Sequence, residues 1–257
     1  MRAQRVALIG IALATALVAT ARGEIAGVQF SADMISRGPD GQVVSGRMYV
    51  GDGRMRMEMT QQGREIVRIS DQNRRMEWIL FPDQQTYIEQ GGSEGQGGGD
   101  APAPLPSAES DPCAGMPGMS CRRLGQEDVS GRPAVKWEMV MTHEGKTLKG
   151  VQWIDAERGL PLKHEMPNGE TMELKLVGNE SIEGRQVEKW EMTTTLPNEQ
   201  PSRTFQWYDP QLKLSVREEF PGGYVRELKS IRIAEQPDHL FTVPAGYTRM
   251  EMPSPEQ

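Results

Sequence analysis

Histidine and cysteine are scarce in this chain, with three of the first and two of the second among 257 residues. None of the histidines, His143, His164 and His239, lies in a metal-binding pattern such as H-E-x-x-H. The sequence also lacks G-x-S-x-G, S-x-x-K, P-loop and dinucleotide-binding glycine patterns. These absences leave no visible catalytic, metal or cofactor site, so we expect a protein that is not an enzyme and has no cofactor.

Helical periodicity is missing as well. No window of about 12 residues keeps a 3.6-residue apolar period. The apolar share is low at 37%, whereas the chain has 28 glycines and 18 prolines. This balance is typical of a turn-rich β protein with one solvated face. The formal net charge of −7 argues against a nucleic-acid partner.

An apolar run long enough to span a bilayer is also absent. Arg2 and Arg5 precede an apolar run of about 16 residues, shorter than the ~20 that a membrane span needs. Ala19-Thr20-Ala21 then matches a cleavage site, so residues 1–21 are predicted to be a Sec-type signal peptide. A membrane anchor is the alternative. No cysteine follows the run, so we expect a periplasmic protein that is not lipidated and has no transmembrane span after cleavage.

The two cysteines, Cys113 and Cys121, both lie in the exported part. An oxidising compartment favours a disulfide between them. Its expected role is local, because it would attach the end of a linker to a strand beginning at Leu124. Their spacing differs from the known zinc and thioredoxin-type spacings, which argues against a metal or redox site.

Four segments follow the signal peptide. Residues 22–89 alternate apolar and polar residues between closely spaced turns, which predicts an antiparallel meander. Residues 90–123 form a Gly/Pro-rich linker that ends in the Cys113–Cys121 loop. Residues 124–252 are predicted to complete the same sheet, and 253–257 are a tail.

A tandem repeat marks the third of these segments. Gly125–Met139 and Gly178–Met192 share eight identical positions of fifteen, and the likeness continues for about 50 residues. Each copy carries two tryptophans on neighbouring predicted strands, Trp137 with Trp153 and Trp190 with Trp207. We expect the two indoles of a copy to share an apolar face, with lysine and glutamate on the opposite, solvated face.

Methionine is the one compositional excess, with sixteen residues. In "RMRMEM", the side chains of Met55, Met57 and Met59 are predicted to point to one face of a strand. Three interpretations stay open. These thioethers form a soft apolar ligand surface, they fill a core, or they bind Cu(I), whose preferred ligands include thioethers.

Several stretches carry a resemblance to a known family. They include "FSADMISRGPDGQVVSGRMYVGDGRMRMEM", "CRRLGQEDVSGRPAVKWEM" and the closing "PDHLFTVPAGYTRM". In the order of these stretches and in its alternation of strands and turns, the chain resembles the LolA/LolB-like lipoprotein-carrier superfamily, in a branch of unknown function. The resemblance implies a mainly β fold, an open and strongly curved antiparallel sheet (a half-barrel) whose concave apolar face receives acyl chains. Helices usually fill that concavity in the family, whereas this chain shows few or no helices.

The preferred hypothesis is a periplasmic binding protein for a lipid, a lipoprotein or another apolar ligand. The candidate binding residues are Met55, Met57, Met59, Trp78, Trp137, Trp153, Trp190 and Trp207. The alternative is a scaffold or sensor domain that binds a protein partner, such as an envelope protein. Cu(I) binding through the methionines is the less favoured third hypothesis.

Overall fold

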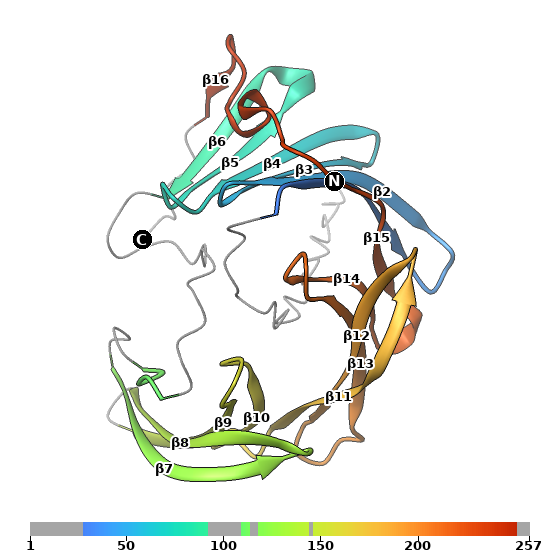
Figure 1. The fold of residues 1–257 in the computed structure, drawn as a ribbon. Helices are drawn as coiled ribbons and strands as arrows, with labels where there is room; N and C mark the ends of the chain where they lie inside the picture. Colours follow the sequence, from blue (N-terminus) through green and yellow to red (C-terminus); the bar gives the residue numbers. More distant parts are fainter. Residues whose placement is uncertain (1–27, 92–108, 114–117, 144–145, 251–257) are drawn as a thin grey trace, which may run out of the picture.

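One open sheet dominates the computed structural model, which describes residues 28–91, 109–113, 118–143 and 146–250. Its 16 strands bend into a C (Figure 1). The strands are β1 (Phe30–Arg37), β2 (Val43–Gly51), β3 (Arg54–Gln61), β4 (Arg64–Asp71), β5 (Met76–Phe81), β6 (Thr86–Gly91), β7 (Met119–Val129), β8 (Arg132–His143), β9 (Lys146–Asp155), β10 (Pro161–Glu165), β11 (Thr171–Ile182), β12 (Arg185–Thr195), β13 (Ser202–Asp209), β14 (Leu214–Glu219), β15 (Val225–Ile233) and β16 (Thr248–Arg249). The predicted mainly β, strongly curved fold is therefore confirmed.

Helices are few and short in the described residues. They are the one-turn 3-10 helices η1 (Pro82–Gln84), η2 (Pro221–Gly223) and η3 (Asp238–Phe241). None of these helices has the length and apolar character needed to cross a membrane. The predicted signal peptide, the tail and most of the predicted linker lie outside the described residues.

The sheet joins two meanders through its first and last long strands. Strands β1–β6 follow one another in space, as do β7–β15, and β1 pairs antiparallel with β15. Residues 92–118 therefore connect strands near the two opposite edges of the sheet. The short β16 adds to β6 in parallel. The sequence predicted a single sheet built from two meanders, but not this β1–β15 junction.

The tandem repeat corresponds to two equivalent four-strand units. Unit 1 consists of β7–β10 and unit 2 of β11–β14. Each unit opens on a tight hairpin, at Ser130-Gly131 or Glu183-Gly184, whose two residues all have positive φ. Such two-residue turns match the twist of the paired strands. Each unit also has a β-bulge in its last strand, at Leu162 or Val216, and both bulged side chains are fully buried.

The C-terminal segment covers one face of the first meander. Phe241 of η3 packs in a cluster with Val67, Ile69 and Leu80, and Tyr247 packs against the same cluster. The guanidinium of Arg54 lies 4.7 Å from the centre of the Phe241 ring. This face of β3–β5 is therefore closed by the chain itself.

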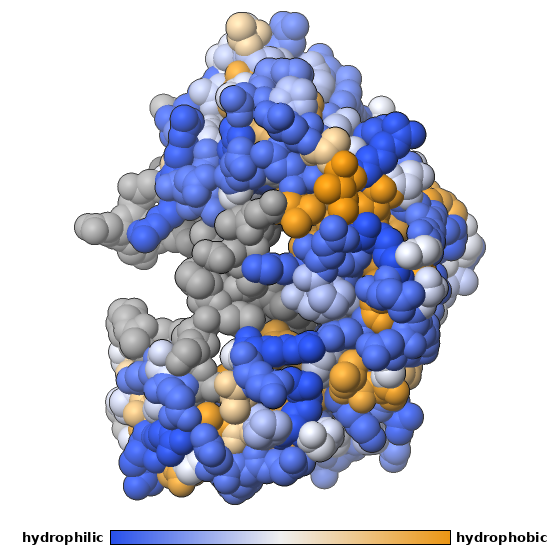
Figure 2. Space-filling model, in the orientation of Figure 1, coloured by the Kyte–Doolittle hydropathy of each residue, from blue (hydrophilic) through white to orange (hydrophobic). Residues whose placement is uncertain are grey.

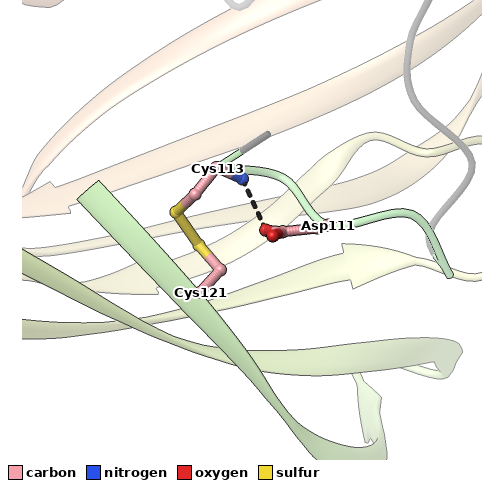
Figure 3. Close-up of side chains that lie close together, drawn as sticks. All are labelled: Asp111, Cys113 and Cys121. Carbon is pink, nitrogen blue, oxygen red and sulfur yellow. Dashed lines mark hydrogen bonds between the residues drawn. A yellow bond between two sulfur atoms is a disulfide. The ribbon is translucent and has the colours of Figure 1, made fainter. Parts of the chain in front are cut away.

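The predicted disulfide between Cys113 and Cys121 is present (Figure 3). Cys121 lies within β7, because this strand begins at Met119 rather than at the expected Leu124. The backbone N–H of Cys113 donates a hydrogen bond to Asp111 Oδ1 at 2.9 Å. The disulfide thus attaches the chain before β7 directly to that edge strand.

Candidate functional site

A methionine-rich surface extends over β1–β3, and we call it the methionine face. Within β3, the side chains alternate as predicted, because Met57 lies opposite Met48 of β2 whereas the neighbouring Arg56 lies opposite Tyr49. Residues directly opposite one another in a sheet share a face, and rows of such pairs run across the strands. The methionine face consists of Met34, Met48, Met55, Met57 and Met59, all half-buried.

Gly46 holds two of these thioethers close to the backbone. It lies between Met34 and Met59 in one row across β1–β3. A Cβ atom at position 46 would lie 3.1 Å from Met34 Cε and 3.2 Å from Met59 Cγ. The two side chains therefore converge over Gly46 and occupy the space that a side chain at this position would need.

The methionine face borders the interior of the C. Met34, Met48 and Met55 pack against a buried cluster that includes Phe30, Val50 and Leu212. Leu212 belongs to the turn between β13 and β14, which projects into the interior of the C (Figure 1).

A second apolar feature lies where β1 begins. A patch of apolar side chains interrupts an otherwise largely hydrophilic surface there (Figure 2). A cavity of about 400 Å³ at this place is lined by Val28, Ile233 and Ala234, with three polar residues completing the lining. Ile233 is nearly half exposed.

The tryptophans are arranged differently from the prediction. Trp153 lies directly opposite Lys136, and Trp137 lies opposite Gln152, so the two indoles of unit 1 are on opposite faces of the sheet. The same register in unit 2 places Trp207 opposite Lys189. The prediction that each pair shares an apolar face is wrong, because facing depends on the strand register, and a shift of one residue reverses it.

The four tryptophans of the repeat are also too deeply buried to form an open aromatic surface. Trp137, Trp153, Trp190 and Trp207 are only 3–5% exposed. Trp78 lies in a row with Ile69, on the face of the first meander that the C-terminal segment covers. It is therefore on the opposite face from Met55, Met57 and Met59, and a ligand-binding role for the five tryptophans stays a prediction.

Each repeat unit builds the same Glu–Lys–Trp contact on its polar face. In unit 1, the indole N–H of Trp153 donates to Glu127 at 2.8 Å, and Lys136 Nζ lies 2.7 Å from the same carboxylate. In unit 2, Trp207 donates to Glu180 at 2.7 Å, and Lys189 Nζ lies 3.0 Å from it.

Both carboxylates of these contacts have a pKa below the usual range. For Glu127 the hydrogen bond from Lys136 is the main cause, followed by that from Trp153. For Glu180 the order is reversed, with Trp207 first and Lys189 second. The Glu-Lys-Trp spacing, which recurs in both copies of the repeat, could have indicated these contacts from the sequence. The incorrect prediction that each pair of tryptophans shares an apolar face obscured them.

Cations also cover the indole rings. Lys136 and Lys163 lie 4.9 and 4.6 Å from the ring centre of Trp153. Lys189 and Arg217 lie 4.7 and 5.4 Å from that of Trp207. Cation–π contacts of this kind stabilise by roughly 0.5–2 kcal/mol. These contacts give the two buried indoles polar partners within the sheet.

A second repeated set of hydrogen bonds fixes the turn that follows the third strand of each unit. Asp155 is fully buried, accepts a hydrogen bond from Arg132, and accepts two more from the backbone N–H groups of Glu157 and Arg158. Asp209 repeats this arrangement with Arg185 and the N–H groups of the following turn. Each aspartate thus fixes a turn, and both turns project into the interior of the C (Figure 1).

The electrostatics of Asp155 fit this structural role. Burial alone would raise the pKa of Asp155, but the hydrogen bonds from Arg132 and the two backbone N–H groups outweigh it and lower the pKa. Glu188 behaves alike, since the paired guanidinium of Arg158 overcomes the effect of burial and lowers its pKa.

Of the described histidine side chains, neither His164 nor His239 belongs to a group with metal-ligand spacing. His164 is half-buried on β10 between Gln152 and Met172, and burial lowers its pKa. Among the described side chains, one group of three has metal-ligand spacing, Asp111 with Cys113 and Cys121. Its two sulfurs are joined to each other (Figure 3), so this group offers no thiolate.

Comparison with solved structures finds several that are similar to this chain. A LolA superfamily protein from Nitrosomonas europaea is 14% identical, with a TM-score of 0.37, over 87% of this chain and 94% of that one. A putative outer-membrane lipoprotein-sorting domain from Vibrio parahaemolyticus is 14% identical, with a TM-score of 0.34, over 86% and 92% of the two chains.

The Pseudomonas aeruginosa MucA/MucB complex also matches, at 14% identity and a TM-score of 0.23, over 85% and 96% of the chains. The LolA superfamily, which the sequence resembles, is thus represented among these similar structures. No protein-family model and no curated protein matches the sequence.

Proposed function

We propose that this chain is a periplasmic, non-enzymatic binding protein that takes an acyl chain, of a lipid or a lipoprotein, on its methionine face. The observation that carries the proposal is the grouping of five half-buried thioethers on one face of β1–β3. The opposite face of the neighbouring strands is closed by the C-terminal segment around Phe241. The predicted signal peptide supports export, and its removal leaves no predicted span.

Methionine suits such a ligand for physical reasons. Its unbranched, polarisable side chain adapts to apolar groups of varied shape. An acyl chain that leaves water gains about 25 cal/mol for each Å² of apolar area buried, so one chain supplies several kcal/mol. Met34 and Met59 meet over Gly46, where no side chain separates them.

The turns that project into the interior of the C also contribute to the apolar surroundings of the methionine face. Leu212 in the β13–β14 turn belongs to the cluster against which Met34 and Met55 pack. The turn is held by the buried carboxylate of Asp209 rather than by a helix. We infer that these anchored turns take the place of the helices that usually fill the concavity in the family that the sequence resembles.

The proposal is tested by titrating the protein with a long-chain fluorescent fatty acid. Met48→Glu places a charge between the apolar Ala32 and Met57 on the methionine face and should weaken binding about tenfold or more, because desolvating a lone carboxylate is costly. Met166→Glu is the matched control, since Met166 is an exposed methionine in the turn before β11. Equal affinity of the two variants, both shown to be folded by circular dichroism, would refute the proposal.

The triple variant with leucine at positions 55, 57 and 59 separates an apolar ligand from Cu(I). Leucine preserves apolar area but has no sulfur, so fatty-acid binding should persist. Cu(I) affinity measured under reducing conditions should fall only if the thioethers are metal ligands. Native mass spectrometry of protein from its own periplasm adds an independent readout, with a co-purified lipid as the expected result.

A protein partner is the second candidate, and one feature favours it. Strand β7, 11 residues long, forms one edge of the sheet, and no described strand pairs with its outer side. The opposite edge is the two-residue β16. A long unpaired edge can accept a strand from another chain. Replacing Gln126 of β7 with proline should then abolish capture of one defined envelope protein while leaving fatty-acid binding unchanged.

A further inference from the structure

Strand β7 forms a long free edge of the sheet. It is 11 residues long and is the lowest strand in Figure 1, with its outer side turned away from β8. Within the described part of the chain, β8 is the only strand that pairs with it. The opposite edge of the sheet ends in the two-residue β16. Natural sheets cover or blunt their edges, because an unpaired edge is a template for a further strand. An edge as long as β7 is therefore a candidate for pairing with another chain.

The charges of β7 are ordered along the strand. Arg122 and Arg123 precede its centre, and Glu127 and Asp128 follow it. When a strand pairs antiparallel with a copy of itself, its first half lies beside the second half of the copy. The arginines of each copy would then face the carboxylates of the other, whereas parallel pairing would set like charges against each other. The edge is thus complementary to itself in one orientation.

The bulge in β7 gives these charges the facing that such pairing requires. Arg122 lies opposite Glu138 of β8, and Glu127 lies opposite Ala134. These two partners are four residues apart on β8, so Arg122 and Glu127 share a face of the sheet. Without the bulge that separates them, their five-residue spacing would place them on opposite faces.

The second pair of charges lies on the other face. Arg123 is opposite Trp137, and Asp128 is opposite Pro133, again four residues apart on β8. A register that sets Arg122 opposite Glu127 of a second copy sets Arg123 diagonal to Asp128 of that copy, within reach of a long side chain. Two-fold symmetry repeats each contact, so both faces of the joined sheet carry complementary charges.

The charged side chains of β7 are accessible to a second copy. Those of Arg122 and Arg123 are 71% and 42% exposed, and that of Glu127 is 49% exposed. Each has an intrachain partner at 3.0, 3.0 and 2.7 Å, respectively Glu138, Glu109 and Lys136. Because exposed ion pairs contribute little to stability, sharing or exchanging them costs little.

The repeat provides an internal comparison for this edge. In unit 2 the matching strand, β11, lies inside the sheet between β10 and β12. The residues of β11 at the places of Arg123 and Asp128 are the uncharged Leu176 and Ser181. The complete order of charges is therefore confined to the copy of this strand that lies at an edge.

We propose that β7 pairs antiparallel with β7 of a second copy of this chain, which forms a two-fold symmetric dimer. The inference rests on the free β7 edge of the second candidate function and names the strand that occupies it. It is independent of acyl-chain binding, because the methionine face lies on β1–β3 and takes no part in the pairing.

Sedimentation of the whole protein over a wide range of concentrations tests the dimer. We expect a concentration-dependent dimer whose dissociation constant rises about tenfold or more in Arg122→Glu, because this change sets like charges opposite each other at two symmetric places. Lys175→Glu is the matched control, since Lys175 is the exposed counterpart of Arg122 on β11. This control should leave the dissociation constant unchanged.

A charge exchange tests the register. Arg123→Glu and the double variant Gln126→Arg/Asp128→Arg should each dimerise more weakly than the wild type, since each sets like charges beside one another. An equimolar mixture of the two should form a heterodimer, detected by native mass spectrometry, because the exchanged charges then attract. A variant that had merely lost its fold would not be rescued in this way.

Two outcomes would overturn the proposal. A protein that stays monomeric at all concentrations would exclude the dimer, while acyl-chain binding and capture of an envelope protein would still stand on their own tests. A dimer that Arg122→Glu and Lys175→Glu weaken equally would show that pairing does not involve β7.

Discussion

The two repeat units share their local structure and differ in what surrounds it. Both have the indole-to-glutamate hydrogen bond, in Trp153–Glu127 and Trp207–Glu180. Yet equivalent carboxylates differ in burial, because β15 pairs with β1 and so brings Arg37 against Glu227, whereas Thr193 of β12 lies opposite Glu173. Repeated sequence thus fixes repeated contacts, while the neighbouring strand decides which copy has a buried polar group.

Removing the buried aspartate of either unit should have the largest effect. Asp155→Ala and Asp209→Ala each leave an arginine and two turn N–H groups without their acceptor. Breaking a buried ion pair in this way costs about 3–5 kcal/mol. Urea unfolding should show similar losses for both variants. A loss in one unit only would break the structural equivalence of the two repeats.

Removing the indole N–H should have an intermediate and equal effect in the two units. Trp153→Phe and Trp207→Phe keep a ring between the cations but lose the hydrogen bond to the glutamate. Because Glu127 and Glu180 are both about half exposed, solvent weakens these hydrogen bonds. We expect a fall in the free energy of unfolding that is smaller than for the aspartate variants and equal in the two units. A difference between them larger than the loss itself would show that the contact is not equivalent.

The pH dependence of stability should show a smaller effect, carried by Asp155. Its pKa is lowered in the folded state from the ordinary value of 3.8, so the folded state binds fewer protons than the unfolded state near that pH. This contribution is fully present above 3.8 and is lost as the pH falls through the lower, folded-state pKa. Asp155→Asn should flatten the acid limb of the stability curve measured by urea unfolding.

An unchanged acid limb in Asp155→Asn would contradict the lowered pKa of this carboxylate. Asp83→Asn provides a control, because Asp83 lies exposed in η1. This control variant should follow the wild-type curve throughout the acid range.

Patterns within single strands predicted much of the fold. The alternation in "RMRMEM" gave the facing of Met55, Met57 and Met59, and the closely spaced turns of residues 22–89 gave an antiparallel meander. Contacts between distant strands were not predictable in this way. The pairing of β1 with β15 depends on the closure of the whole sheet, and it alone brings Arg37 to Glu227.

The tryptophans show the same limit within one hairpin. Lys136 and Trp153 share a face because of the β8–β9 register, which single-strand alternation does not specify. The burial of Asp155 and Asp209 could not be predicted from the local pattern, since their arginine partners lie 23 and 24 residues away.

The most direct test of the central claim uses the methionine methyl groups themselves. Protein labelled with ¹³C at the methionine ε-methyls is titrated with a fatty acid, and the chemical shifts are followed by NMR. The acyl-chain proposal predicts saturable shifts at Met34, Met48, Met55, Met57 and Met59, with the exposed Met141 and Met166 unchanged. Shifts confined to Met141 and Met166, or no saturable shift at all, would contradict it.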